Sequence, residues 1–525
     1  MALSEKYQPT TANKEPQVSA KDDKEHYGVI VMGCGVSGMA TAIQLKRKMG
    51  FEDVLVYEKA DDIGGTWNAN RYPGAACDIP FTLYSFSFAP AYNVSSQWAG
   101  QKEILDYLHK VQRDFKLHNV VFRTLVETAH FSRETGLWTL SVRDLTTNQV
   151  RTRTCNILIS CLGALTIPNA PPFDPKEFNG EVFHSAEWRD DVSLKGKDVV
   201  VVGNGCSAAQ IVPELVKECG TVTQIARSRQ SILRRIAVPD GWLLSWLMRW
   251  IPGIGFLLRA LIFLGSETLF KISDIEKGRE EREKTVKDTE AYIKETAPQK
   301  YWDVLKPDFD IAAKRRVFDS GYYACLNSPN MELIADDGVV SAKGDKVYTR
   351  NGRVVKADVI VLATGFKVHE MLFPLKIYND EGVMLQERLG ENGAKVFQST
   401  VVSDYPNFFW IMGPQSATGH STVLFTSECQ ITLVFRLIKP ILAKLRKVQL
   451  LRPAPYVEVT QEAEDAFMAD IRKEMKKKVW EIGGGVSWYC GTDGLCHTLY
   501  PYSQIEFYRR CTFMRLTDKF VWTGC

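Results

Sequence analysis

The chain has 525 residues, of which 45% are hydrophobic and 24% charged, and its net charge is +3. These values predict a soluble globular α/β protein of two to four domains, and so small a net charge without a long Lys/Arg run excludes a nucleic-acid partner. The 12 cysteines show no CxxC spacing and the eight histidines no metal-ligand spacing, so we expect free thiols in the cytoplasm and no metal site.

The first segment of the chain, residues 1–25, is polar and mixed in charge. It contains no apolar stretch of the kind that a secretory signal requires. We therefore expect a disordered lead-in.

A dinucleotide-binding pattern begins at the first apolar run. Residues 29–32 predict a buried strand, residues 40–46 predict a helix, and a GxGxxG motif stands between them. Its glycines serve the tight turn, the close approach to a pyrophosphate and the packing of helix on strand. After a second predicted strand, 54–57, an acid stands where a carboxylate binds ribose hydroxyls. The candidate cofactor residues of this unit are Gly33, Gly35, Val36, Ser37, Gly38, Glu58 and Lys59.

The same pattern recurs 170 residues further on, with strands at 199–202 and 222–226 and a helix at 208–215. The second strand ends at Arg227-Ser228-Arg229, where an NAD site has an acid. A guanidinium binds a 2′-phosphate through paired hydrogen bonds, so the sequence predicts NADPH, with Arg227 favoured by register and a solvated basic cluster as the alternative. The candidate residues of this unit are Gly203, Asn204, Gly205, Ser207, Ala208, Arg227 and Ser228.

Two further motifs carry a resemblance to a known family. The segment Gly64-Gly65-Thr66-Trp67, followed by Tyr72-Pro73-Gly74 and Asp78, resembles an FAD-side motif of class B flavoprotein monooxygenases. The motif Phe178-x-Gly180-x3-His184-x3-Trp188 resembles the fingerprint of type I Baeyer–Villiger monooxygenases, whose N-oxygenating relatives usually end it with Tyr or Phe. Arg189 departs from the Pro or Asp that usually follows the tryptophan. The resemblance, which is to fungal-type members, extends from about residue 27 over nearly the whole chain.

This resemblance implies roles for residues throughout the chain. FAD would occupy the first unit and NADPH the second. Lys314 would reach the NADP 2′-phosphate, and Arg315 would lie over the flavin with Asp78 orienting it; Arg316 is the alternative if the register slips by one. His184 would couple domain movement to catalysis without acting as a general base. The remaining residues that the resemblance places at the cofactors are Gly65, Thr66, Trp67, Tyr84, Thr364, Gly365 and Trp488. His420 is either substrate-facing or a satisfied buried histidine.

The expected reaction is oxidation of a hydrophobic ketone by O2 to an ester or lactone, in secondary metabolism. A flavin C4a-peroxide must stay anionic to attack a carbonyl, and a fixed guanidinium would stabilise that anion and the oxyanion that follows. The alternative is an N- or S-oxygenating flavin monooxygenase, which needs no such arginine. A disulfide reductase of similar build is disfavoured by the missing CxxC, and a non-catalytic FAD-binding scaffold is the other alternative.

The expected fold class is α/β, with two Rossmann-like dinucleotide-binding domains and a helical insertion. We expect an FAD domain at 26–165 and 358–525, and an NADPH domain at 166–357 that contains the insertion at about 236–310. The apolar stretch 242–264, interrupted by arginines, glycines and a proline, predicts a buried helical hairpin; a monotopic membrane contact is the alternative. We expect a monomer or a weak oligomer.

Overall fold

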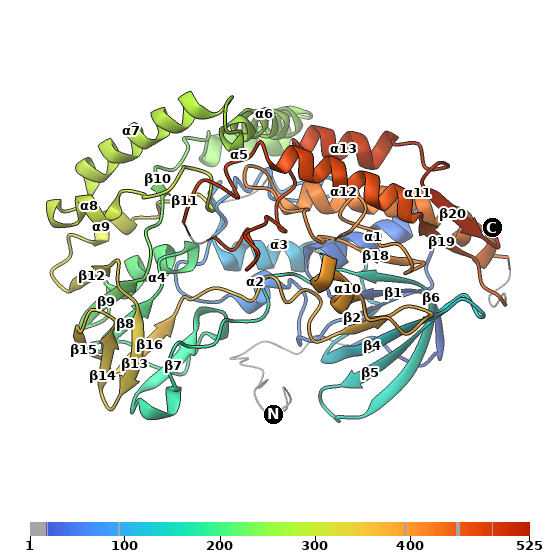
Figure 1. Ribbon diagram of the computed structural model, residues 1–525, viewed down its shortest axis with the longest axis horizontal. Helices are drawn as coiled ribbons and strands as arrows, with labels where there is room; N and C mark the ends of the chain where they lie inside the picture. The colour runs from blue at the N-terminus through green and yellow to red at the C-terminus, as the bar shows by residue number, and fades with distance from the viewer. Residues whose placement is uncertain (1–16, 18, 93–94, 393–394, 448–451, 486) are drawn as a thin grey trace.

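The computed structural model describes residues 17, 19–92, 95–392, 395–447, 452–485 and 487–525. Two sheets organise the protein, one at each side of the view in Figure 1, and helices lie along the upper edge of both. The order of strands and helices confirms the predicted α/β class with two Rossmann-like sheets and a helical insertion.

The first sheet contains eight strands in the order β17-β4-β5-β6-β1-β2-β3, with β18 also paired to β6. Its nucleotide-binding part is parallel, whereas β4, β5 and β6 form an antiparallel meander. The strands are β1 (His26–Met32), β2 (Val54–Tyr57), β3 (Val120–Val121), β4 (Thr124–Ser132), β5 (Leu137–Asp144), β6 (Val150–Ser160), β17 (Lys376–Tyr378) and β18 (Phe408–Trp410). Alternation along β1 divides the core, because Val29 and Val31 join the cluster that contains α1 and α11, whereas Ile30 and Met32 join the cluster on the opposite face.

The second sheet contains five parallel strands in the order β12-β9-β8-β16-β7. Its strands are β7 (Glu181–His184), β8 (Asp198–Val202), β9 (Thr221–Ala226), β12 (Met331–Ala335) and β16 (Val359–Leu362). Helix α4 (Cys206–Leu215) covers one face. A small antiparallel sheet covers the other and consists of β13 (Val339–Lys343), β14 (Lys346–Thr349) and β15 (Val354–Lys356).

The position of β16 corrects one expected boundary. We expected the chain to rejoin the first unit at residue 358, but β16 pairs with both β8 and β7 inside the second sheet. Its four residues are all buried, and so continuous an apolar run is typical of a parallel strand covered on both faces. The chain reaches the first sheet again only at β17.

The remaining elements are short strand pairs and helices. Strands β10 (Ile232–Leu233) and β11 (Val317–Phe318) pair in parallel, and β19 (Tyr456–Val459) and β20 (Phe520–Thr523) pair antiparallel. The other helices are α1 (Val36–Met49), α2 (Thr66–Ala69), α3 (Gln101–Asp114), α5 (Trp242–Trp250), α6 (Ile254–Thr268), α7 (Arg279–Thr296), α8 (Trp302–Leu305), α9 (Tyr322–Cys325), α10 (Leu385–Asn392), α11 (Val423–Leu445), α12 (Gln461–Met475) and α13 (Gln504–Phe513).

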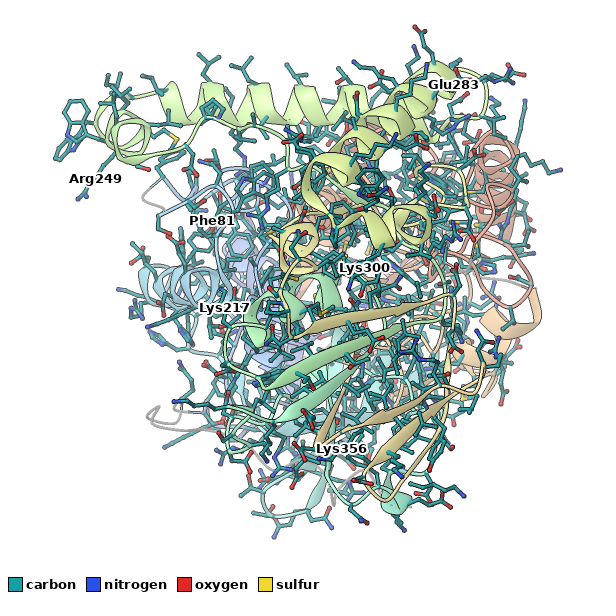
Figure 2. The ribbon with its side chains drawn as sticks, turned by 90° about the vertical axis from the view of Figure 1, so that its left-hand side faces the viewer. Phe81, Lys217, Arg249, Glu283, Lys300 and Lys356 are labelled. Carbon is teal, nitrogen blue, oxygen red and sulfur yellow. The ribbon has the colours of Figure 1, made fainter. Side chains whose placement is uncertain are left out.

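The predicted buried hairpin at 242–264 is wrong. Helices α5 and α6 form there, but Trp250, Phe256 and Leu257 are more than half exposed. Figure 2 shows α6 along the upper edge of the molecule with side chains that point away from it. Among the described residues no single helix is long and apolar enough to cross a membrane; residues 243–250 and 254–273 reach that length and hydropathy only as a pair bent by 116°.

We expected residues 1–25 to be disordered. That prediction is wrong for residues 20–25, and most of the rest of the segment lies outside the described residues. Asp22 forms an ion pair with Arg153 at 2.7 Å, and both side chains are nearly buried. The hydroxyls of Tyr27 and Tyr57 donate to the same carboxylate. These bonds hold residues 20–25 against the first sheet, where the backbone N–H of Ala20 also donates to the carbonyl of Val120.

Candidate active site

A cleft of about 3000 Å³ opens beyond the ends of strands from both sheets. Ligands of open α/β sheets bind at this end of the strands. Three predicted site residues, Gly38, His184 and Ala208, do not line the cleft. The predicted residues that do are Gly33, Gly35, Val36, Ser37, Glu58, Lys59, Gly65, Thr66, Trp67, Asp78, Tyr84, Gly203, Asn204, Gly205, Ser207, Arg227, Ser228, Lys314, Arg315, Thr364, Gly365 and Trp488.

The turn after β1 forms a backbone cradle at the start of α1. A Cβ on Gly38 would lie 1.9 Å from the carbonyl oxygen of Gly33, and one on Gly65 would lie 2.9 Å from Cα of Gly35. Helix α1 begins after Gly35 with no capping side chain and no acid in its first turn. Its free N–H groups and the helix dipole therefore favour an anion, which fits the pyrophosphate of FAD.

Glu58 lies at the end of β2 beside this cradle. Its carboxylate accepts hydrogen bonds from the backbone N–H of Cys34 at 2.6 Å and of Ala60 at 2.9 Å. Burial raises the pKa of Glu58, and the two N–H donors offset this only in part. The acid therefore holds the turn and also lines the cleft, where a ribose-binding carboxylate is expected.

The turn after β8 repeats this geometry. A Cβ on Gly203 would lie 2.3 Å from the carbonyl oxygen of Ala363, and Gly205 begins α4 with no capping side chain and no acid in the first turn. Ala208 is fully buried at the packing position. Asn204 donates its side-chain amide to the carbonyl of Ser228 at 2.6 Å, which joins this turn to the end of β9. This second cradle fits the pyrophosphate of NADPH.

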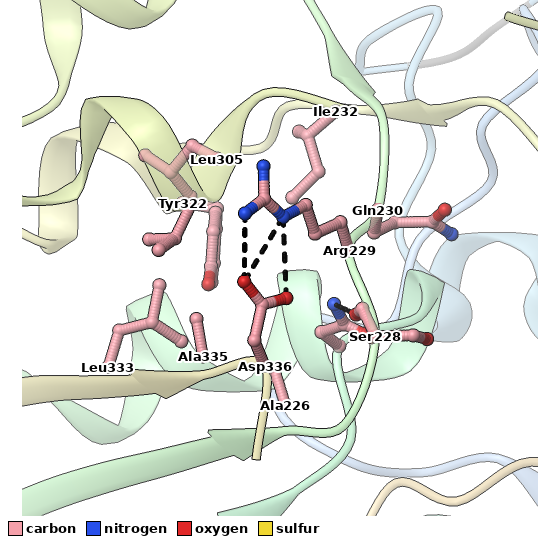
Figure 3. A pocket seen from close by; sticks show the side chains of 12 residues that line it. Ala226, Ser228, Arg229, Gln230, Ile232, Leu305, Tyr322, Leu333, Ala335 and Asp336 are labelled. Carbon is pink, nitrogen blue, oxygen red and sulfur yellow. Dashed lines mark hydrogen bonds and ion pairs between the residues drawn. The ribbon is translucent and has the colours of Figure 1, made fainter. Parts of the chain in front are cut away.

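The basic residues after β9 differ in their partners. Arg229 forms an ion pair with Asp336 at 2.9 Å, which Figure 3 shows in the small pocket that these residues line. Arg229 also donates to the carbonyl of Asp303. Lys314 donates to the carbonyl of Arg229 at 2.9 Å, and burial lowers the pKa of Lys314. Arg229 is thus engaged by the protein, and Arg227 is the exposed guanidinium of this segment on the cleft wall.

Two neighbouring arginines have different surroundings. Arg315 Nη2 donates to Asp78 Oδ2 at 2.5 Å, whereas Arg316 Nη2 donates to the carbonyl of Gly419 at 3.1 Å. Burial disfavours both charges, but the Asp78 carboxylate outweighs this and raises the pKa of Arg315. Burial lowers the pKa of Arg316 to about 10. Only Arg315 of the two lines the cleft.

Asp78 reaches Arg315 because its loop packs directly on α4. Gly74, at φ +82°, lies so close to α4 that a Cβ would stand 2.4 Å from the carbonyl oxygen of Gln210. The hydroxyl of Tyr72 donates to the Gln210 side chain, whose amide donates to the carbonyl of Ala76. The loop from the first unit is therefore fixed to the second unit within a few residues of Asp78.

The flavin side of the cleft contains an aromatic pair. Trp67 Nε1 donates to the hydroxyl of Tyr84 at 2.9 Å, and the two rings meet edge to face. Elsewhere in the cleft lining, Asn169 donates from its side chain to the carbonyl of Thr364 and from its backbone to that of Gly365. Asn169 is a residue that the sequence reasoning missed, since a single asparagine in a linker carries no motif.

His420 is a satisfied buried histidine. Its Nε2 lies 2.8 Å from the carboxylate of Glu267, and its Nδ1 lies 2.9 Å from the hydroxyl of Thr418. Burial lowers the pKa of His420, and Nε2 donates to the Glu267 carboxylate, which accepts. Glu267 also accepts from the backbone N–H groups of Gln504 and Ile505. Sequence reasoning missed Glu267, whose only signal was an isolated acid after a long apolar stretch.

The site therefore defines a class of protein with two dinucleotide cradles and a paired arginine between them. Comparison with known proteins agrees. Residues 26–249 match the flavin-binding monooxygenase-like family model. The FAD-binding monooxygenase ktnD of Aspergillus niger is 28% identical over 93% of this chain and 81% of that protein. A Baeyer–Villiger monooxygenase of Streptomyces coelicolor is 30% identical over 94% of this chain and 92% of that protein.

Among solved structures, an oxidised steroid monooxygenase bound to NADP has a TM-score of 0.78 and 25% identity, over 95% of this chain and 100% of that one. The chain belongs to the type I Baeyer–Villiger monooxygenase family of class B flavoproteins. The predicted family is confirmed, and with it an enzyme class, the flavoprotein monooxygenases that depend on FAD and NADPH.

His184 generates a prediction about acid stability. Its ring, at the end of β7, accepts a hydrogen bond at Nδ1 from the N–H of Ala186, and burial lowers its pKa to about 4. The unfolded chain takes up this proton near pH 6.5, so the stability from a neutral His184 is complete above pH 6.5 and is lost as the pH falls toward 4. The loss in the free energy of unfolding is at most about 3 kcal/mol. We expect it to disappear in His184→Asn, because the asparagine amide oxygen accepts the same hydrogen bond but takes up no proton.

Thermal unfolding midpoints of the two proteins between pH 7.5 and pH 4 measure this difference. The wild-type midpoint should fall more steeply than that of the variant. Parallel curves would show that His184 takes up its proton as readily in the folded protein as in the unfolded one.

Proposed function

We propose that the enzyme converts ketones to esters or lactones, a Baeyer–Villiger oxidation that uses NADPH and O2. The observation that carries this proposal is the Arg315–Asp78 pair on the wall of the cleft. A permanently charged and fixed guanidinium stabilises negative charge on oxygen while a nucleophile adds to a carbonyl. An enzyme that oxygenates only amines or sulfides has no tetrahedral oxyanion to stabilise.

The chain's own residues would hold the two cofactors at the two cradles. The N-termini of α1 and α4 would bind the pyrophosphates, Glu58 the ribose of FAD, and Trp67 with Tyr84 would form a wall beside the flavin. When bound, NADPH supplies the hydride and FAD activates the oxygen. Trp488, which lines the cleft and is partly exposed, would lie beside the nicotinamide.

Asp78 would act as the positioning residue of this site. A buried guanidinium without a counter-charge loses part of its preference for the charged form, as the lowered pKa of Arg316 illustrates. The carboxylate 2.5 Å from Arg315 removes this penalty and selects one rotamer. Arg315 would then meet the reacting oxygen with its remaining donors, which need no rearrangement during the reaction.

The first test replaces each arginine by lysine, which keeps the charge but loses the planar fork. We expect Arg315→Lys to lower ketone oxidation about 100-fold or more while NADPH oxidation continues, because the ammonium lacks the fork that binds Asp78 and still directs donors at the oxyanion. Arg316→Lys is the matched control and should retain most of the activity. Product masses from linear, cyclic and aryl ketones measure the effect. A tertiary amine and a sulfide are offered in parallel. N- or S-oxides from these substrates, without an ester from any ketone, would assign the enzyme to the alternative reaction.

NADPH selectivity is the second part of the proposed function, and Arg227 would bind the 2′-phosphate, with Ser228 and Lys314 close to it. We expect Arg227→Ala to raise KM for NADPH about 10- to 100-fold and to leave KM for NADH nearly unchanged, since only charge-assisted bonds to the phosphate are lost. Arg229→Ala, which breaks the pair with Asp336, should change both KM values alike. Steady-state kinetics with both nucleotides test this, and equal selectivity in Arg227→Ala and the wild type would contradict it.

We also propose the cytoplasm as the compartment. All 12 cysteines are free thiols in the structure, and several of them are buried in the core. Free buried thiols persist in reducing compartments, whereas an oxidising one favours disulfides.

A further inference from the structure

The most apolar exposed surface of the protein is formed by α5 and α6. Of the 22 large hydrophobic side chains that are exposed among the described residues, eight fall between residues 243 and 264. They are 42–72% exposed and form what we call the apolar face: Leu243, Trp246, Trp250, Ile251, Phe256, Leu257, Leu261 and Leu264. So contiguous an apolar surface marks a contact with a partner or a membrane.

The other side of the helix pair is anchored, so the apolar face is held outward. Arg259 donates to the carbonyls of Thr82 and Ser85, each at 2.8 Å. Gly255 packs so closely on Tyr92 that a Cβ there would lie 2.3 Å from its ring. The two helices are bent by 116°, a geometry in which the pair lies along a surface rather than crossing a bilayer as one helix.

The charge and side-chain types of this surface favour lipid over protein. No acid occurs between Asp240 and Glu267. Among exposed residues from 243 to 264, Arg249 alone has a polar side chain, and it lies over the ring of Trp250. Protein interfaces surround an apolar centre with hydrogen-bonding groups. Tryptophan, leucine and a basic residue are instead typical of helices that lie in an anionic bilayer surface.

A third helix, α13, extends the apolar face. Phe263 of α6 contacts Phe425 of α11, which contacts Tyr508 of α13. Figure 1 places α6 and α13 on the same upper edge. Ile505, Tyr508 and Phe513 of α13 are exposed. The exposed side chains of Arg509 and Arg515 form ion pairs with Glu506 and Asp518. The apolar face therefore continues onto α13, where ion pairs lie beside the exposed apolar side chains, and Arg249 remains its unpaired basic group among the described residues.

We propose that α5 and α6, with the adjoining surface of α13, dock the enzyme on anionic phospholipid bilayers as a monotopic contact. The apolar side chains enter the boundary between headgroups and acyl chains, and Arg249 contacts lipid phosphate. The proposed membrane contact lies next to the cleft. Glu267 at the end of α6 binds His420. The neighbouring residues Thr418 and Ser421 line the cleft. This proposal is independent of the reaction proposed above.

Sedimentation of the FAD-loaded enzyme with vesicles tests the proposal. The wild type should sediment with phosphatidylcholine vesicles that contain phosphatidylserine, and more weakly with vesicles of phosphatidylcholine alone. Leu257→Ser combined with Leu261→Ser should weaken this binding at least about tenfold, because two buried leucines are lost. The matched control, Val150→Ser with Val354→Ser, changes two aliphatic side chains that are 50% and 53% exposed on the strands β6 and β15 and should bind like the wild type. Arg249→Glu should weaken binding to the anionic vesicles alone.

Three outcomes would overturn the proposal. The wild type could stay in the supernatant with both kinds of vesicle, or the double leucine variant could sediment as the wild type does. In the third outcome, light scattering shows that the wild type is a dimer and the double leucine variant a monomer, and neither binds vesicles. That result would assign the apolar face to a second copy of the chain. An unchanged flavin spectrum and thermal midpoint of the variants confirm that the fold is intact.

Discussion

The ion pair between Asp78 and Arg315 joins the two nucleotide-binding units at the cleft. Asp78 comes from a loop of the first unit, and Arg315 comes from the chain of the second. Arg316, one residue further on, has no carboxylate within ion-pair distance in the described part of the protein, and burial lowers its pKa. The comparison of these neighbours indicates that the carboxylate, rather than the local chain, determines which guanidinium has the raised pKa.

Close backbone contacts allow this pair to form. Gly74 permits its loop to touch α4, and Gly38 and Gly203 permit the two turns to bend next to their strands. In both units the helix that follows begins at a glycine without a capping side chain. The same device therefore leaves N–H groups available for a pyrophosphate on each side of the cleft, with the arginine between them.

Local patterns predicted much of the fold and of the candidate site. The strand, glycine turn and acid at 29–58 form a continuous local unit, and they lie as expected. The predictions failed where the position or burial of a segment depends on contacts with residues far away in the sequence. The apolar run of β16 fits either sheet, and only its pairing with Val199 and Glu181 decides between them. The exposure of Leu257 and the bond between Glu267 and His420 likewise depend on which surfaces meet in three dimensions.

A double-mutant cycle measures the coupling between the two partners most directly. Asp78→Asn, Arg315→Lys and the double variant are compared with the wild type by kcat/KM for ketone oxidation. If the carboxylate acts through the guanidinium, the second substitution should add little to the first, and the coupling should far exceed the few tenths of a kcal/mol seen for independent sites. Losses that simply multiply would show that Asp78 and Arg315 act separately and would contradict the account.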